Sequence, residues 1–189
     1  MTAAELIRFE AEVAENFNAG RIRGPIHLSG GNEKQLIEIF RHIPKDSWIF
    51  STWRNHYHAL LHGIHPSEVM AQIMAGRSMN LAFPQYRFFT SAIVGGILPI
   101  AVGVAAAGEH VWCFIGDMAA STGIFHEALR YAEGHRLPIE FVIEDNGMST
   151  NSPTVECWGE PKAFSPPRFI RYNYKRTTEH VGTGQFVHF

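Results

Sequence analysis

Two largely apolar runs constrain the fold of this chain more than any other feature. They span residues 111–115 and 139–143, and between them residues 122–133 show helical spacing, with Gly134 at the expected C-terminal cap. Apolar runs without polar alternation are typical of strands that are buried on both faces of a parallel sheet. The sequence therefore predicts an α/β fold, in which a parallel sheet is flanked by helices.

Apolar spacing predicts most of the remaining elements. Residues 3–18 carry apolar side chains at intervals of three and four, which indicates an amphipathic helix. Asn32 and Gln35 resemble a capping pair at the start of a helix that runs to Pro44. Further helices are expected over residues 54–63, 66–75 and 97–108, and a short strand over residues 48–50. We expect one domain over residues 1–189, with a core at 24–150 and a tail at 151–189.

Composition narrows the class of protein. The chain has 189 residues, 46% hydrophobic and 18% charged, which is typical of a globular domain. A net charge of -2 gives no electrostatic bias toward nucleic acid or acidic membranes. The longest apolar stretch, residues 92–107, is shorter than the ~20 residues of a membrane span and contains Gly and Pro. The acidic N-terminus does not resemble a signal peptide. Cys113 and Cys157 form no disulfide framework, which favours a reducing cytoplasmic location.

Polar residues follow both predicted strands. Asp117 comes after the first strand and Asn146 after the second, so a parallel sheet would bring them to the same edge. Carboxylate and amide oxygens suit Mg²⁺ or Ca²⁺ better than zinc. A helix that opens near Thr122 would add N–H groups that favour a diphosphate. The alternative is that Asp117 caps this helix and Asn146 shapes a turn.

A family resemblance extends over these strands and beyond them. The segment from Gly116-Asp117-Met118 to Asp145-Asn146 resembles the thiamine-diphosphate motif, which begins Gly-Asp-Gly and ends Asn-Asn. Further blocks occur in the family's order at residues 53–60, 65–70, 76–80 and 93–99. Together they resemble the α subunit of the pyruvate and branched-chain 2-oxo-acid dehydrogenase E1 components, over residues 24 to about 150.

The resemblance implies a thiamine-diphosphate-binding fold with thiamine diphosphate and Mg²⁺ as cofactors. The implied metal ligands are Asp117, the side chain of Asn146 and the carbonyl of Met148. The implied cofactor-binding residues are Trp53, Arg54, Ala92, Ile93, Val94, Gly116, Asp117, Met118, Ala119, Asn146 and Met148. His27 falls at the position of an active-site histidine, and His56 is expected to face the cofactor cleft, so both are candidate catalytic residues.

The implied activity is decarboxylation of a 2-oxo acid followed by transfer of the acyl or aldehyde unit. The catalytic glutamate would come from a β-like subunit in a heterotetramer, docked around residues 92–107 and the helix from Thr122. Met118 replaces the motif's Gly, and Asn80 replaces a histidine. The sequence also stops before the family's histidine-bearing loop. A non-oxidative, transketolase-like carboligase and a non-catalytic relic of the fold are therefore alternatives.

Two other patterns allow different functions. His58 and His62 stand four residues apart on an expected helix, which can form half of a zinc site. Residues 168–176 interleave basic and aromatic side chains, as single-stranded nucleic-acid binders do. Ile170, Tyr172 and Tyr174 also alternate with polar residues, which favours a strand with one buried face or a partner-docking tail.

Overall fold

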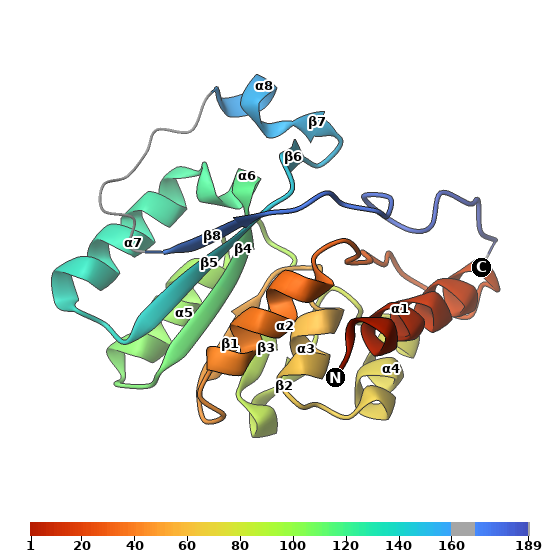
Figure 1. Cartoon of the computed structure of the whole chain (residues 1–189), viewed down its shortest axis with the longest axis horizontal. Coiled ribbons are helices and arrows are strands. Elements are labelled where there is room, and N and C mark those ends of the chain that lie inside the picture. Colours follow the sequence, from red (N-terminus) through yellow and green to blue (C-terminus); the bar gives the residue numbers. More distant parts are fainter. Residues whose placement is uncertain (160–168, 189) are drawn as a thin grey trace.

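The computed structural model describes residues 1–159 and 169–188, and within them a six-stranded sheet runs through the centre of the molecule (Figure 1). The strand order is β2-β3-β1-β4-β5-β8. Neighbouring strands are parallel, except that β2 runs antiparallel to β3. The strand bounds are β1 Trp48–Ser51, β2 Ala82–Phe83, β3 Phe88–Thr90, β4 Val111–Gly116, β5 Ile139–Asp145 and β8 Ile170–Asn173. A separate small hairpin pairs β6 (Met148–Ser149) with β7 (Ser152–Pro153).

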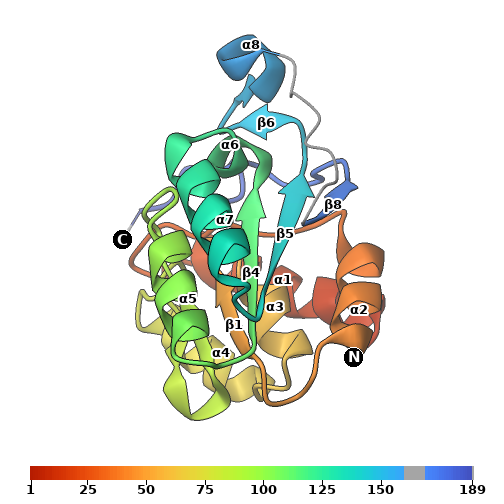
Figure 2. The ribbon, with the colours of Figure 1, turned by 90° about the vertical axis from the view of Figure 1, so that its left-hand side faces the viewer.

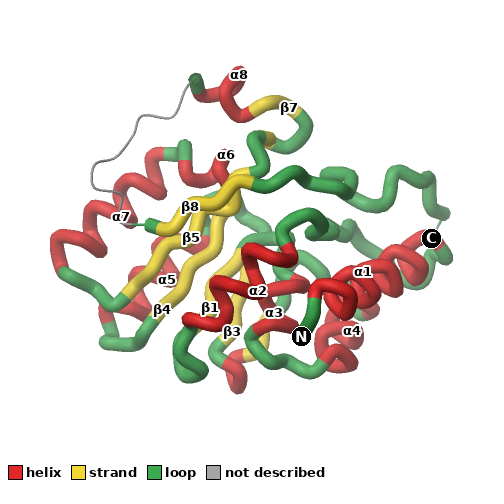
Figure 3. The backbone as a smooth tube through the Cα atoms, in the orientation of Figure 1, coloured by secondary structure: helices red, strands yellow, loops and turns green. Residues whose placement is uncertain are grey.

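Helices cover both faces of the sheet (Figures 2 and 3). One face carries α1 (Ala3–Asn18), α2 (Glu33–His42), α3 (His56–Leu61) and α4 (Pro66–Met74). The other carries α5 (Ile97–Ala106), α6 (Asp117–Ala120) and α7 (Gly123–His135). The 3-10 turn η1 (Pro84–Tyr86) joins β2 to β3, and α8 (Thr154–Trp158) follows β7. This layered arrangement confirms the predicted α/β class.

The side chains of β4 and β5 alternate between two hydrophobic cores. Phe114 and Val142 pack beneath α1 to α4, while Cys113 and Phe141 pack beneath α5 and α7. All four are at most 1% exposed. A strand buried on both faces has no polar face, and this explains why the predicted strands read as continuous apolar runs.

The ends of two helices differ from the predictions. Helix α7 begins where predicted, with Thr122 as its N-cap, but it runs to His135, and its C-cap is Arg136 in the left-handed region (φ 53°) and not Gly134. The short helix α6, which begins at Asp117, was not predicted. Asn32 is the residue before α2, but its side chain makes no capping bond. It donates instead to Glu144 Oε1 and Tyr172 Oη, each at 3.1 Å. The predicted capping pair is therefore wrong, because a buried long-range partner replaces the local one.

The tail contains the strand predicted at residues 170–174, and then crosses the molecule. Tyr172 Oη donates to Glu144 Oε1 at 2.6 Å, whereas Ile170 is 37% exposed and is not part of a buried face. Arg168, the first residue of the basic and aromatic run, lies outside the described residues. Beyond β8 the tail follows residues 26–31: the N–H of Thr177 donates to the Gly30 carbonyl at 3.3 Å, and that of Gly182 donates to the Ile26 carbonyl at 2.8 Å (Figure 1).

Neither a membrane span nor a disulfide is found in the described part of the chain. No helix there combines the length and the apolar character needed to cross a bilayer. Cys113 is buried in the core and Cys157 is exposed, and both are free thiols.

Candidate functional site

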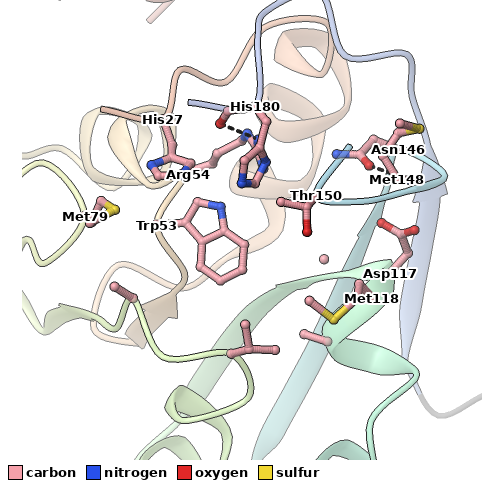
Figure 4. Close-up of a pocket in the computed structure, with 14 residues that line it drawn as sticks. His27, Trp53, Arg54, Met79, Asp117, Met118, Asn146, Met148, Thr150 and His180 are labelled. Carbon is pink, nitrogen blue, oxygen red and sulfur yellow. Dashed lines mark hydrogen bonds between the residues drawn. The ribbon is translucent and has the colours of Figure 1, made fainter. Parts of the chain in front are cut away.

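A cavity of about 290 Å³ opens at the carboxyl ends of the central strands (Figure 4). Ligands of open α/β sheets bind at this edge. Trp53 and Arg54 reach the cavity from the loop after β1, Asp117 from the end of β4, and Asn146 from the end of β5. The lining residues are His27, Trp53, Arg54, Met79, Ala92, Val94, Gly116, Asp117, Met118, Ala119, Asn146, Met148, Thr150 and His180.

One end of the cavity is rich in polar nitrogens that have no protein partner. Among the described residues, the side chain of Arg54 bonds only to His180: Nη2 lies 3.1 Å from the ring Nδ1 and 3.0 Å from the carbonyl oxygen. Arg54 Nε, Trp53 Nε1 and His27 Nδ1 are buried without a hydrogen-bond partner among those residues. A buried polar group that is left unpaired costs about 1–3 kcal/mol. This end of the cavity is therefore suited to an acceptor-rich, negatively charged ligand.

The charge of this end comes from Arg54 and not from the histidines. Burial, followed by the nearby Arg54 cation, lowers the pKa of His27 to about 3. The pKa of His180 is also lowered, first by burial and then by Arg54 and Arg176. The His27 and His180 rings meet edge to face with their centroids 5.1 Å apart. At neutral pH both rings are uncharged, so a fixed guanidinium beside two neutral imidazoles faces the cavity.

The opposite end of the cavity holds a buried carboxylate. Asp117 is 4% exposed, and Thr154 Oγ1 donates a hydrogen bond to its Oδ2. Burial raises the pKa of Asp117, and the neighbouring Asp145 raises it further. Asp145 is itself paired with Arg171, whose Nη2 lies 2.6 Å from Oδ2, but no ion pair of Asp117 is found within the described residues. Asp117 is thus a buried carboxylate whose charge is not balanced by any cation among the described residues.

Asn146 has the turn-shaping contact considered from the sequence, and this contact does not exclude the metal-binding alternative. Its Oδ1 accepts the backbone N–H of Met148 at 2.9 Å, and its Nδ2 donates to Tyr174 Oη at 3.2 Å. The turn-shaping role is therefore present. An amide oxygen has two lone pairs, so Oδ1 can accept this bond and still ligate a cation. Asp117, in contrast, is the first residue of α6 and does not cap it.

The structure brings the predicted site residues together, apart from His56 and Ile93. His56 is fully buried, with Nδ1 3.1 Å from Glu10 Oε1 and Nε2 2.9 Å from Ser78 Oγ. The expectation that it faces the cleft is wrong, because α3 turns its ring toward α1. Ile93 is 72% exposed and does not line the cavity, and neither does Thr122, because α6 lies between it and the end of β4.

The two histidines considered for zinc point to different partners. His58 Nδ1 lies 3.0 Å from Ser51 Oγ, and its Nε2 is 3.3 Å from Glu144 Oε2. His62 Nε2 lies 2.8 Å from the Tyr86 carbonyl oxygen. In the described residues, no group of three or more His, Cys, Asp or Glu side chains is arranged to hold a metal. The site formed by Asp117 and Asn146 has a different composition, with one carboxylate and one amide.

Residues 1–157 match the family model described as dehydrogenase E1 component. The chain belongs to the dehydrogenase E1 component family. It is 32% identical over 165 residues to the α subunit of acetoin:2,6-dichlorophenolindophenol oxidoreductase from Bacillus subtilis, which covers 79% of this chain and 50% of the relative. It is 31% identical to the pyruvate dehydrogenase E1 component subunit alpha of Rickettsia prowazekii, over 80% of this chain and 53% of the relative.

This E1-family chain spans about half the length of the curated relatives it matches. A solved structure from Mycobacterium smegmatis, described as a candidate thiamin diphosphate-dependent enzyme, is 22% identical with a TM-score of 0.45. That likeness covers 69% of this chain and 24% of the other.

Sequence reasoning missed three lining residues, Met79, Thr150 and His180. Met79 lies inside the block at residues 76–80, so the resemblance could have indicated it. Thr150 has a left-handed backbone (φ 63°) in the turn between β6 and β7. His180 lies beyond the part of the chain that matches the E1 family model and meets Arg54 across 126 positions, so no local pattern indicates it.

Proposed function

We propose that this chain is the α-like subunit of a thiamine-diphosphate- and Mg²⁺-dependent enzyme that decarboxylates a 2-oxo acid and transfers the acyl or aldehyde unit. One observation carries the proposal: a single cavity has buried, unpartnered nitrogens at one end and a buried carboxylate without a cation at the other. A diphosphate bound to Mg²⁺ has the complementary charges, because its oxygens would meet Arg54 and its metal would meet Asp117.

The residues present fit both parts of this ligand. Arg54 and Trp53 would hold the diphosphate, because a guanidinium donates several charge-assisted hydrogen bonds. Asp117, the Asn146 oxygen and the Met148 carbonyl would hold Mg²⁺, which takes oxygen ligands and keeps several waters or phosphate oxygens.

The rest of the cavity suits the organic part of the cofactor. Ala92 and Val94 line it with small side chains, so that backbone can approach the aminopyrimidine ring, while Met118 and Ala119 lie beside the metal ligands. When bound, thiamine diphosphate supplies the electron sink for decarboxylation. The chain's own contribution is to bind the diphosphate, fix the metal and orient the ring.

A second subunit belongs to the proposal. Asp117 is the only carboxylate among the described residues that line the cavity, so the glutamate needed beside the aminopyrimidine is left to a partner. Ile93 and Val94 lie just before α5 and Ile100 lies within it, and their side chains are 72%, 40% and 43% exposed. Exposed apolar side chains that gather on one surface mark an interface, and we propose this segment as the docking surface. A β-like subunit would cover it and complete the site in a heterotetramer.

Two free thiols support a reducing, cytoplasmic setting for this enzyme. The net charge of -2 and the absence of a spanning helix from the described residues fit a small-molecule enzyme. The described part of the basic and aromatic run forms β8 beside β5, and the residues that follow it bond to residues 26–31, so this segment is used within the chain.

Native mass spectrometry of the chain co-expressed with its genetic neighbour tests the proposal. With Mg²⁺ and thiamine diphosphate, we expect an α₂β₂ mass that carries two cofactors, and we expect Asp117→Ala to lose them. A chain that takes up no cofactor under any condition would leave the non-catalytic relic as the better account. Product analysis with and without a lipoyl domain then separates dehydrogenase chemistry from carboligation, because only the former needs the lipoyl acceptor.

A further inference from the structure

The wall of the cavity next to Arg54 is formed by the tail, which lies outside the part of the chain that matches the family model. The tail leaves β8 at Tyr174, whose N–H donates to the Asp145 carbonyl at 2.9 Å. Arg176 Nη1 then reaches the Thr150 carbonyl at 3.3 Å, and Thr178 Oγ1 lies 2.7 Å from the Ser29 carbonyl. These contacts anchor the tail before His180, and the bond from the Gly182 N–H to the Ile26 carbonyl anchors it after His180.

Two glycines show that the tail and residues 26–31 are fitted to each other. Gly30 and Gly31 have φ angles of 88° and 98°, which side chains rarely adopt. A Cβ at Gly31 would lie 2.1 Å from the Lys175 carbonyl oxygen, and one at Gly30 would lie 2.6 Å from Thr177 Oγ1. The backbone of the tail therefore approaches as closely as glycine permits. This close packing of the tail on residues 26–31 fixes the position of His180 in the cavity.

His180 is also the sole anchor of the Arg54 guanidinium among the described residues. Its ring Nδ1 and its carbonyl oxygen both accept from Nη2, at 3.1 and 3.0 Å (Figure 4). Within residues 1–159 and 169–188, no carboxylate performs this task, and Arg54 Nε is left without a partner. A carboxylate would neutralise the guanidinium and compete with an anion for it. A neutral imidazole and a carbonyl fix its plane and leave its charge intact.

We propose that His180 is a positioning residue for the diphosphate: it holds Arg54 through Nη2, so that Nε and the positive charge face the bound anion. This inference rests on the proposed function, because it assumes that the cavity binds a diphosphate. His180 acts through Arg54, so its loss weakens binding of the diphosphate group and leaves turnover at saturating cofactor unchanged.

The test is calorimetric titration of the co-expressed complex with inorganic pyrophosphate plus Mg²⁺ and, separately, with thiamine diphosphate plus Mg²⁺. We expect His180→Ala to weaken both ligands by the same factor, about tenfold, which is typical of one lost hydrogen bond to a charged group. His180→Asn should restore most of the affinity, because its amide oxygen can take the place of Nδ1. His188→Ala, at an exposed histidine of the same tail, should bind like the wild type.

Three readouts distinguish positioning from general stability: an unchanged melting temperature, an unchanged kcat at saturating thiamine diphosphate, and rescue by Asn. Wild-type affinity in His180→Ala, tighter binding in it, or failure of His180→Asn to rescue would each overturn the role of His180 alone. A wild-type complex that binds neither ligand would overturn the proposed function, and with it this inference.

Discussion

Thr154 Oγ1 donates a hydrogen bond to Asp117 Oδ2, and this neutral hydroxyl is the side-chain donor that the structure records for the buried carboxylate. A hydroxyl satisfies the hydrogen-bonding capacity of one oxygen but does not balance the charge. The carboxylate consequently titrates above its usual pKa, because burial and Asp145 both oppose its ionisation. Ionisation of Asp117 thus costs free energy in the apo site, and a bound cation would remove this cost.

Asp117→Asn should stabilise the apo chain while abolishing Mg²⁺-dependent cofactor binding. The folded pKa of Asp117 is raised, so its stability contribution is largest at low pH and is lost as pH rises from the unfolded pKa through the folded one. Asparagine has no charge to bury and therefore removes this loss. We expect the free energy of unfolding at neutral pH to rise by about 1 kcal/mol, a common size for a stabilising substitution. Urea denaturation measures it. Asp46→Asn, at an exposed aspartate, should change nothing, and a less stable apo Asp117→Asn would contradict the prediction.

His27→Gln should make the free energy of unfolding depend less on pH in the acidic range. The folded pKa of His27 lies near 3, so the unfolded chain binds a proton first. The stability contribution is therefore complete above about pH 6.5 and falls as pH drops toward 3. The wild type should lose up to about 1.4 kcal/mol per pH unit from this group. Denaturation curves between about pH 7 and pH 4 check it. His188→Gln, at an exposed histidine, should keep the wild-type slope; equal slopes for all three proteins would exclude the effect.

Arg54→Lys should weaken thiamine diphosphate binding by about 10- to 100-fold without lowering the stability of the apo chain. A lysine keeps the charge but lacks Nε and the planar fork, so it loses hydrogen bonds to the anion worth about 1.5–3 kcal/mol. Titration calorimetry at fixed Mg²⁺ gives the affinity. The exposed Arg23→Lys is the matched control. Wild-type affinity in Arg54→Lys would mean that the diphosphate binds elsewhere.

Glu10→Ala should destabilise the fold by about 3 kcal/mol, because it removes the acceptor of two buried groups, and each buried group left unpaired costs about 1–3 kcal/mol. The Glu10 carboxylate accepts the Ser29 N–H at 2.9 and 2.8 Å and lies 3.1 Å from His56 Nδ1. Its loss would leave a buried imidazole and a buried amide unpaired. Glu12→Ala, at an exposed position of the same helix, should stay within about 0.5 kcal/mol of the wild type. Comparable losses for the two variants would show that Glu10 acts through helix α1 alone.

Ile100→Asp should prevent assembly with the β-like subunit and leave the fold intact. Ile100 is 43% exposed on α5, where a charge costs little in the free chain. In the assembled interface the same charge would be buried, and we expect partner affinity to fall by at least about 30-fold, as for an interface hot spot. Size-exclusion chromatography with mass detection reports it. Ile7→Asp, on the 54%-exposed Ile7 of α1, should assemble normally. Normal assembly of Ile100→Asp would place the interface elsewhere.

The sequence indicates those parts of the structure that depend on local patterns. The apolar runs that became β4 and β5 are unambiguous because both faces of each strand are buried, and strand ends then place Asp117 near Asn146. The pairing of β2 with β3 was not predicted. The two strands contain two and three residues, too few for an alternating pattern to be recognised.

The missed and misplaced site residues depend on distant partners. His56 was assigned to the cleft from its place beside Arg54, but Glu10 and Ser78 draw its ring into the interior from 46 and 22 positions away. His180 enters the cavity through a tail that is fixed by residues 26–31. No spacing rule connects such segments, because their contact is decided by packing of the whole chain.

The docking of the tail has a consequence for the order in which the molecule folds. Thr178 Oγ1 contacts the Leu28 carbonyl across 150 positions, and bringing such distant segments together carries a large loop-closure entropy. Contacts of this kind form slowly and late. During synthesis strands β1 to β5 can pair before residues 177–182 have left the ribosome, whereas the end of the cavity that contains His180 cannot form until then. The pocket wall next to Arg54 is thus expected to form only after residues 177–182 have reached residues 26–31.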